Sequence, residues 1–482
     1  MVPQVSDSPE QKQEHEEQQP VAQPLPTRQT RLSRAGIISL LALIGMLLIT
    51  ITGMLIRNPE QLMPQAQLPT PTSVPASPTA THAPIPTATP QPDVSPTPVP
   101  PLLTANGQSV SSLQLSMGHF VLYEQQNNIY MVSSSGGLPQ AISTPGYLYN
   151  QAVRPILTPK GQLLYAGNGI WITDVFDGKS RQIATIGADQ VVTSLALSSD
   201  GSTVAYTVEP ANGRGNIDLY AGPLSSPALV YQQTTANCPC FRVFSFLYGQ
   251  GQRGDTTLLL ADSQNSQNGV QYGLWSMDLT QAPVDTPTQL MSEDDLEGPL
   301  LMAPYSNVLL YSSNEGTVPV PTDETIPADI ASLTYANSLD LANIGGNPLT
   351  VSSSQVVLPE QRNLSNPADY RWETTPVFSP DGHTLVYVEF SSEPQAPFDR
   401  VSAIYEAQVS GTGSQLHVSA PQLLATSSAS LLELGPWFND HILTFYADGT
   451  LYAMDPQTMA VTTIIQTNAY ARIIAVVGLN QI

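Results

Sequence analysis

The sequence predicts an all-β fold, a β-propeller of four-stranded antiparallel blades, preceded by one transmembrane helix. Three observations lead to this fold class. A strand–turn–strand unit recurs along residues 105–482, and short Val/Leu/Ile/Tyr runs alternate there with Gly, Pro, Asn, Asp and Ser. A single uncharged apolar stretch lies near the N-terminus. We expect seven blades, with six or eight as alternatives.

Residues 35–56 form the predicted transmembrane helix. These 22 residues carry no charge, and about 20 apolar residues at 1.5 Å rise cross a ~30 Å hydrocarbon core. A cleaved signal peptide is the alternative, but its apolar region usually has only ~7–15 residues and is followed by a small-residue cleavage site. Here 34 residues precede the apolar run, and Ile56-Arg57-Asn58-Pro59 follows it. These flanks favour an uncleaved anchor.

The arginines beside this stretch predict its orientation. Arg28, Arg31 and Arg34 precede the helix, and Arg57 follows it. Basic residues favour the cytoplasmic side, so we expect a single-pass protein of the cell membrane with a cytoplasmic N-terminus and an extracytoplasmic propeller. Residues 1–34 are rich in Gln and Glu and lack an apolar face, which predicts a disordered tail.

Residues 57–104 form the predicted linker. Fourteen prolines occur in the 44 residues from Asn58 to Pro101. Each proline fixes φ and removes a backbone donor, so helix and sheet are both disfavoured. An extended polyproline segment of this length reaches on the order of 130 Å. The linker is therefore a spacer, or alternatively a stalk through a cell-wall layer with O-glycosylated threonines.

The repeated unit of residues 105–482 is predicted to form two strands joined by a tight turn. Its clearest copy is Pro376–Val388, where Asp381-Gly382 supplies the positive φ of a hairpin turn. The second strand of each unit carries a large apolar anchor: Tyr123, Tyr165, Tyr206, Leu260, Tyr311, Tyr387 and Tyr446. Seven anchors indicate seven blades. The remaining run Ile473–Val477 either closes the ring against the first blade or begins an eighth.

These residues also resemble a known family. The unit Phe378-Ser379-Pro380-Asp381-Gly382, together with Leu-Tyr-x-x-Asp strands such as Thr450–Asp455, is similar to the TolB-like, WD-repeat-like propellers of bacterial envelopes. The resemblance covers most of residues 105–482, and only the unit around Asp381 matches closely. It implies a propeller fold, here on a single-pass membrane anchor.

Composition and motifs exclude several functions. Sixteen Lys+Arg against 39 Asp+Glu give a net charge of −23, which excludes a polybasic nucleic-acid binder. No Gly-x-Ser-x-Gly or His-Glu-x-x-His motif occurs, so we assign no catalytic residue and no metal ligand, and we expect a non-enzymatic protein. The alternative is a glycan- or lactone-processing enzyme with paired carboxylates in the central channel. The predicted inner strands contain no carboxylate: Pro155–Thr158, Leu195–Ser198, Pro376–Ser379 and Pro436–Phe438.

Cys238 and Cys240 are the two cysteines of the chain. Outside the membrane such a pair predicts a disulfide. A bridge across one residue is strained, so two reduced thiols or half of a metal site remain alternatives.

The long loops indicate one functional face. In a propeller, the loops that join strands 2–3 and 4–1 emerge on the same side, and the predicted insertions all fall there: residues 209–216, 262–271, 315–332, 352–370 and 391–400. This side also carries a set of acidic residues: Glu293, Asp294, Asp295, Glu297, Asp323, Glu324 and Asp329. We predict that they bind a basic partner or a divalent cation such as calcium, and a solvated acidic surface is the alternative. No other cofactor is expected.

The predicted function is therefore that of a surface-exposed binding or scaffold module. Its partners would be the membrane, through residues 35–56, and a protein or a cell-wall glycan, through the loop-bearing face. A propeller fold by itself does not decide among functions.

Overall fold

The computed structural model describes most of the propeller. The described residues are 101–150, 153–236, 239–249, 255–262, 271–280, 286–298, 300–313, 338–352, 354–359, 370–393, 396–439 and 441–478, with only the backbone described at 297, 370–375 and 391–400. Within these ranges no helix has the length and apolar character needed to cross a membrane. The predicted tail, the predicted transmembrane helix and residues 57–100 of the predicted linker lie outside them.

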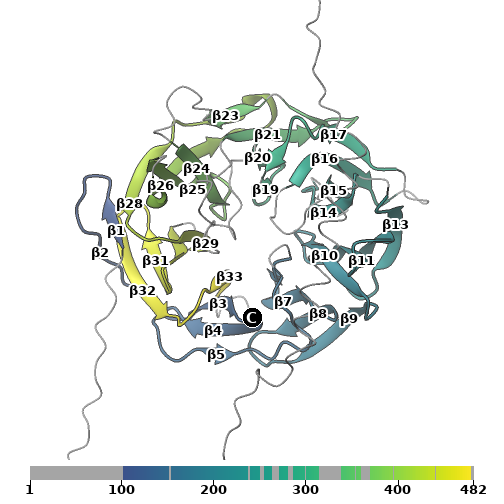
Figure 1. The fold of residues 1–482 in the computed structure, drawn as a ribbon, viewed down its shortest axis with the longest axis horizontal. Helices are drawn as coiled ribbons and strands as arrows, with labels where there is room; N and C mark the ends of the chain where they lie inside the picture. Colours follow the sequence, from purple (N-terminus) through teal and green to yellow (C-terminus); the bar gives the residue numbers. More distant parts are fainter. Residues whose placement is uncertain are drawn as a thin grey trace, which may run out of the picture. The chain divides into compact units, whose positions relative to one another are not determined.

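Seven sheets form a ring (Figure 1). Each sheet contains four antiparallel strands that form a blade, and some sheets carry further strands. Blade 1 contains β33 (Arg472–Gly478), β3 (His119–Gln125), β4 (Asn128–Ser133) and β5 (Gln140–Ala141). Blade 2 contains β6 (Ile156–Leu157), β7 (Gln162–Ala166), β8 (Gly169–Asp174) and β9 (Ser180–Thr185). Blade 3 contains β10 (Gln190–Leu197), β11 (Thr203–Pro210), β12 (Asn216–Pro223) and β13 (Ala228–Thr234).

The other four blades follow the same order from the inner to the outer strand. Blade 4 contains β14 (Phe241–Phe246), β15 (Thr257–Asp262), β16 (Gln271–Asp278), β17 (Thr288–Met291) and β18 (Glu297–Gly298). Blade 5 contains β19 (Leu300–Met302), β20 (Val308–Tyr311), β21 (Leu339–Gly345), β22 (Thr350–Val351) and β23 (Gln355–Leu358). Blade 6 contains β24 (Tyr370–Phe378), β25 (Thr384–Glu393), β26 (Ala396–Ser410), the 3₁₀ turn η2 (Gly413–Gln415), β27 (His417–Val418) and β28 (Gln422–Ser427). Blade 7 contains β29 (Leu432–Asn439), β30 (Ile442–Ala447), β31 (Thr450–Asp455) and β32 (Ala460–Gln466).

The predicted anchors all lie on second strands, which confirms the prediction of seven blades. Each of β3, β7, β11, β15, β20, β25 and β30 carries one of them. In three blades the anchor stacks on a tyrosine of the third strand: the ring centroids are 5.4 Å apart for Tyr123 and Tyr130, 5.1 Å for Tyr206 and Tyr220, and 5.6 Å for Tyr387 and Tyr405. Such aromatic pairs contribute about 0.5–1.5 kcal/mol beyond the area that they bury.

The C-terminal strand closes the ring. β33 pairs antiparallel with β3 and is the innermost strand of blade 1. Val477 of β33 and Val121 of β3 are both fully buried. The run at Ile473–Val477 therefore completes the first blade, as in the first of the two predicted alternatives, and does not begin an eighth.

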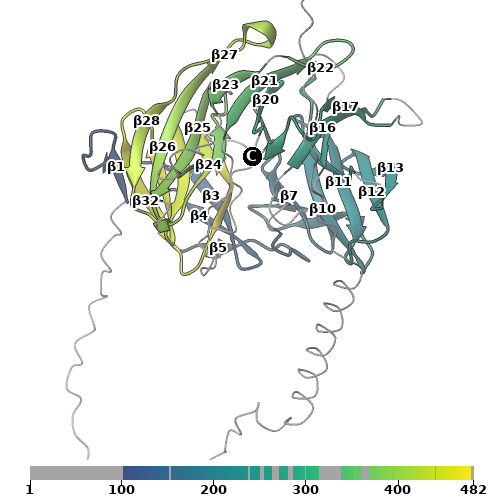
Figure 2. The same cartoon turned by 45° about the horizontal axis from the view of Figure 1, so that its top comes forward.

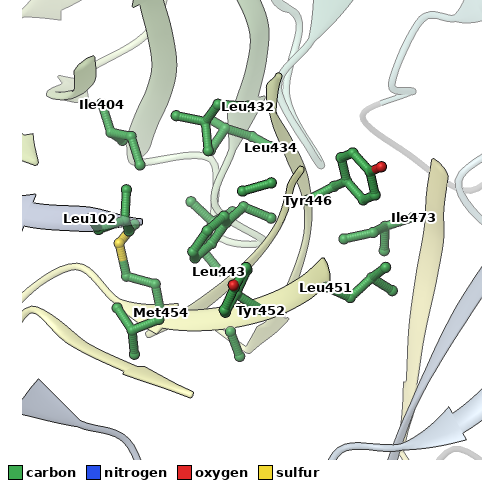
Figure 3. Packing of buried hydrophobic residues seen from close by; sticks show 14 of the residues in the cluster. Leu102, Ile404, Leu432, Leu434, Leu443, Tyr446, Leu451, Tyr452, Met454 and Ile473 are labelled. Carbon is green, nitrogen blue, oxygen red and sulfur yellow. The ribbon is translucent and has the colours of Figure 1, made fainter. Parts of the chain in front are cut away.

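A segment before the first blade covers the outer edges of two others. β1 (Leu102–Thr104) pairs antiparallel with β28, and β2 (Ser111–Ser112) pairs parallel with β32. Leu102 is buried in the cluster that also holds Ile404 and Met454 (Figure 3). β1 thus occupies the last three residues of the predicted linker, and it was not expected from the sequence.

We call the side where strands 1–2 and 3–4 are joined the tight-turn face. At two of these turns a serine hydroxyl donates to an aspartate two residues on: Ser198 to Asp200 and Ser379 to Asp381, both at 2.6 Å. The glycine that follows each aspartate has a φ near +70°, which glycine adopts without strain. The Asp-Gly turns are therefore formed as predicted.

We call the opposite side the long-loop face. The prediction of a loop at residues 391–400 on this face is wrong. Residues 391–400 belong mainly to a hairpin, because β25 runs to Glu393 and β26 begins at Ala396 (Figure 2). Pro397 lies within β26. β28 pairs only with residues 402–406 of β26, so the end of the hairpin lacks the second neighbour that proline would disturb. β23 likewise occupies part of the predicted loop 352–370.

Candidate functional site

The structure places part of the predicted acidic set on one turn of blade 4. Glu293, Asp294 and Asp295 lie between β17 and β18, and Glu297 lies in β18. The Ser292 hydroxyl donates to Asp295 Oδ2 at 2.6 Å. Burial, and then the charges of Asp262 and Asp294, raise the pKa of Glu293.

The rest of the predicted acidic site is not assembled by the described residues. Asp323, Glu324 and Asp329 lie outside them. Among the residues that are described, no group of three or more His, Cys, Asp or Glu side chains is arranged to hold a metal ion. The binding of calcium or of a basic partner at this turn stays a prediction.

Cys240 lies beside the long-loop end of blade 4. It is buried and disulfide-bonded, and its backbone N–H donates to Asp262 Oδ1 at 2.8 Å. Cys238 lies outside the described residues, so its pairing with Cys240 stays a prediction.

A set of charged and tyrosine side chains meets where blades 7, 1 and 2 adjoin on the long-loop face. The first half is a buried ion pair between Glu124, at the end of β3, and Arg472, at the start of β33. Arg472 Nε donates to Glu124 Oε1, and the Tyr147 hydroxyl donates to Glu124 Oε2. Arg472 Nη2 also donates to the carbonyl of Asn150 at 3.1 Å, and its guanidinium carbon lies 5.0 Å from the centroid of the Tyr149 ring.

The second half is built on Glu433 of β29. The Tyr470 hydroxyl donates to Glu433 Oε2 at 2.6 Å, and Arg154 Nη2 lies 3.7 Å from Glu433 Oε1. Glu433 is buried, whereas 61% of the Arg154 side chain is exposed. We call the seven residues of both halves the junction cluster: Glu124, Tyr147, Tyr149, Arg154, Glu433, Tyr470 and Arg472.

The electrostatics show that the two halves act on one another. Burial raises the pKa of Tyr149, and the charges of Glu124 and Glu433 raise it further. The charges of Arg472 and Arg154 oppose this rise. Burial and then a neighbouring carboxylate raise the pKa of Tyr147, beside Glu124, and of Tyr470, beside Glu433. Burial alone would lower the pKa of Arg472, but the charge of Glu124 raises it. Tyr147 and Tyr470 therefore stay protonated at neutral pH and donate hydrogen bonds to these carboxylates.

A further ion pair lies at the long-loop ends of blades 3 and 4. Arg242 Nη2 of β14 donates to Glu209 Oε2 of β11 at 2.5 Å, and both side chains are largely buried. Burial lowers the pKa of Arg242, against the charges of Glu209 and Asp262. Its Nε is buried without a hydrogen-bond partner among the described atoms.

Glu433 and Arg472 were not expected from the sequence, because the inner strands extend further than predicted. The inner strand predicted at Pro436–Phe438 begins at Leu432 and includes Glu433, and the closing strand begins at Arg472, one residue before the predicted run. Both residues are ionisable and adjoin an apolar strand run, and this pattern could have indicated buried charges. No local pattern joins Glu124 to Arg472, which are 348 residues apart in the chain.

Strand order and ring closure define the protein as a seven-bladed β-propeller. No family model matches the chain, and no curated protein matches it. Similar solved structures include an oligogalacturonate lyase in complex with manganese, which has 15% identity, covers 75% of this chain and 87% of its own, and has a TM-score of 0.43. A putative TolB from Agrobacterium tumefaciens has 13% identity, coverages of 75% and 100%, and a TM-score of 0.33.

A periplasmic gluconolactonase from Pseudomonas aeruginosa has 11% identity, coverages of 74% and 99%, and a TM-score of 0.43. The neighbours thus include enzymes as well as TolB. With TM-scores under 0.5, none of these likenesses bears on function, and the fold assignment rests on the strand pairing itself.

Proposed function

We propose that the chain is a membrane-anchored, extracytoplasmic binding or scaffold module that engages its partner through the long-loop face. One observation carries this proposal: the ion pairs whose carboxylates are buried or largely buried lie, among the described residues, at the long-loop ends of the strands. They are Glu124–Arg472, Glu433–Arg154 and Glu209–Arg242. The pair Lys179–Asp177 lies in a turn of the tight-turn face and is exposed.

Stability alone is a poor explanation for these pairs. Desolvation of two charges often offsets their attraction, and apolar replacements of similar volume are frequently neutral or stabilising. A buried charged network lowers the stability of the fold most when some of its hydrogen bonds are unmade. The concentration of the ion pairs on one face therefore favours a role in recognition, in which they hold the loops in a fixed shape.

The binding function is favoured over a hydrolase because the cluster's carboxylates are already engaged. A glycosidase-type site needs two carboxyl groups that face the substrate. Glu124 accepts from Tyr147 and Arg472, and Glu433 accepts from Tyr470. Both carboxylates therefore serve to position neighbouring side chains.

A photo-crosslinking amino acid tests which face binds. It is introduced at Leu148, on the long-loop face and 62% exposed, and in a matched variant at Leu138, on the tight-turn face and 93% exposed. We expect the full-length protein in its host cells to form a discrete crosslinked product from position 148 and none from position 138. A product from 138 alone, or from neither position, would overturn the proposal.

A protease added to intact cells tests the anchor and its orientation. The proline content of residues 57–100 predicts a segment open to proteases, so cleavage there should release a fragment of residues ~60–482. Complete protection would reverse the orientation, and spontaneous release without protease would indicate a cleaved signal peptide. Cells lysed before protease treatment provide the control for protease access.

A further inference from the structure

The segment Tyr147–Asn150 on the long-loop face is fixed at several points. The Tyr147 hydroxyl donates to Glu124, and the Tyr149 backbone N–H donates to Asn127 Oδ1 at 2.9 Å. Asn150 Nδ2 donates to the carbonyl of Val192 in β10 at 3.3 Å, and the Asn150 carbonyl accepts from Arg472. The segment is therefore held by Glu124, Asn127 and Arg472 of blade 1 and by Val192 of blade 3.

This fixed segment exposes apolar side chains. Leu148 is 62% exposed and Tyr149 is 39% exposed. Val191 is also exposed, and it precedes Val192, whose carbonyl accepts from Asn150. A segment that is already ordered loses little conformational entropy when a partner binds. Exposed tyrosine and arginine side chains are the types that dominate binding energy at interfaces.

Arg154 adds a charge that complements a carboxylate. Glu433 is its ion-pair partner in the described part of the chain, and the 3.7 Å separation is longer than a hydrogen bond. Arg154 also contributes to the pKa shift of Tyr149, so its guanidinium lies within electrostatic reach of that ring. An exposed guanidinium is uncommon in this chain, which has 16 Lys+Arg against 39 Asp+Glu and a net charge of −23. Its planar donors suit a bidentate carboxylate.

We infer that Leu148, Tyr149 and Arg154 bind an extended protein segment that presents an apolar side chain close to a carboxylate. The apolar side chain packs on Leu148 and Tyr149, and the carboxylate accepts from Arg154. This inference rests on the proposed function and names the partner's chemistry. The carboxylate comes from an Asp or Glu side chain or from the chain end.

The probe is a displayed library of random 12-residue peptides, selected against the full-length protein in lipid nanodiscs. We expect the selected peptides to share an Asp, a Glu or a free chain end within a few residues of a large apolar residue. Resynthesis with a free and with an amidated C-terminus distinguishes the two sources. Loss of binding on amidation assigns the carboxylate to the chain end, and retained binding assigns it to a side chain.

Variants that reverse or add a charge then test the roles of Arg154 and Leu148. Arg154→Glu and Leu148→Asp should each weaken binding of the selected peptides at least tenfold. The matched controls Lys179→Glu and Leu138→Asp change an exposed lysine and an exposed leucine on the tight-turn face, and they should leave binding within twofold. Replacing the peptide carboxylate by Lys should restore binding to Arg154→Glu. Thermal unfolding of each variant verifies that the propeller is intact.

Three outcomes would overturn the inference, and the first two concern the selected peptides. One is a set of selected peptides without a carboxylate preference, and the other is binding that Arg154→Glu leaves unchanged. A library that yields no binder also overturns it. Crosslinking at position 148 would in that case still support the long-loop face as the binding face, so the two proposals fail separately.

Discussion

The two ends of the blades are held by different kinds of contact. At the tight-turn face, Ser379 donates to Asp381 two residues away, and Ser198 does the same with Asp200. At the long-loop face, Glu124 pairs with Arg472 across 348 residues of chain. The first kind of contact forms within a hairpin as soon as it folds. The second forms only when the ring has closed, because its two partners lie on β3 and β33.

Breaking the ring-closing pair should have the largest effect. We expect Arg472→Ala to lower the free energy of unfolding by about 3–5 kcal/mol, because Glu124 would be left buried without its counter-ion. Chemical denaturation followed by tryptophan fluorescence measures the loss.

The double variant Glu124→Leu/Arg472→Met is the control for this prediction. It removes both charges and keeps side-chain volume, so most of the lost stability should return. A double variant as unstable as Arg472→Ala would show that the hydrogen bonds of the pair to Tyr147 and Asn150, and not an unpaired charge, account for the loss.

The same contrast explains what the sequence could predict. The Asp-Gly turns and the second-strand anchors depend on residues close together in the chain, so the pattern around Asp381 and Tyr387 predicted the hairpins and the number of blades. The junction cluster depends on residues far apart in the chain. Arg472 is the first residue of one inner strand and Glu433 is the second residue of another, and a single sequence does not show which distant charge they meet. β1 was missed for a similar reason, since its three residues follow a proline-rich stretch and form a strand only against β28.

Two aspartates at opposite ends of the strands should respond to pH in opposite directions. Asp340 lies near the long-loop end of β21, and burial raises its pKa to about 6. A raised carboxyl pKa favours the folded state at low pH, and this contribution is lost as the pH rises from about 4 through 6.

We therefore expect Asp340→Asn to stabilise the protein at pH 7 by about 1–2 kcal/mol, reduced from the full value of the shift because part of the field reaches solvent. The gain should fall to a small part of its pH 7 value near pH 4, where Asp340 is protonated in the folded state and about half protonated in the unfolded state. Denaturation midpoints at pH 4, 5.5 and 7 measure this dependence. A gain that is equal at all three values would assign the effect to shape and not to charge.

The smallest effect is expected at the tight-turn face. A hydrogen bond from the Ser379 hydroxyl, and then one from the backbone N–H of His383, lower the pKa of Asp381. A lowered pKa gives stability that is present above the unfolded-state value of about 3.9 and is lost as the pH falls through the folded-state value. Asp381 is exposed, so solvent screens its charge, and Asp381→Asn should cost less than about 1 kcal/mol at pH 7.

The difference between the wild type and Asp381→Asn should shrink below pH 4, which is opposite in sign to the trend for Asp340. Asp200→Asn provides the matched control, because Ser198 and Ser202 make the equivalent contacts there. Parallel denaturation series for both variants measure the trend. If either variant became more stable than the wild type as the pH rose, the carboxylate would be destabilising its turn. The two ends of the blades would then not differ in the sign of their pH dependence.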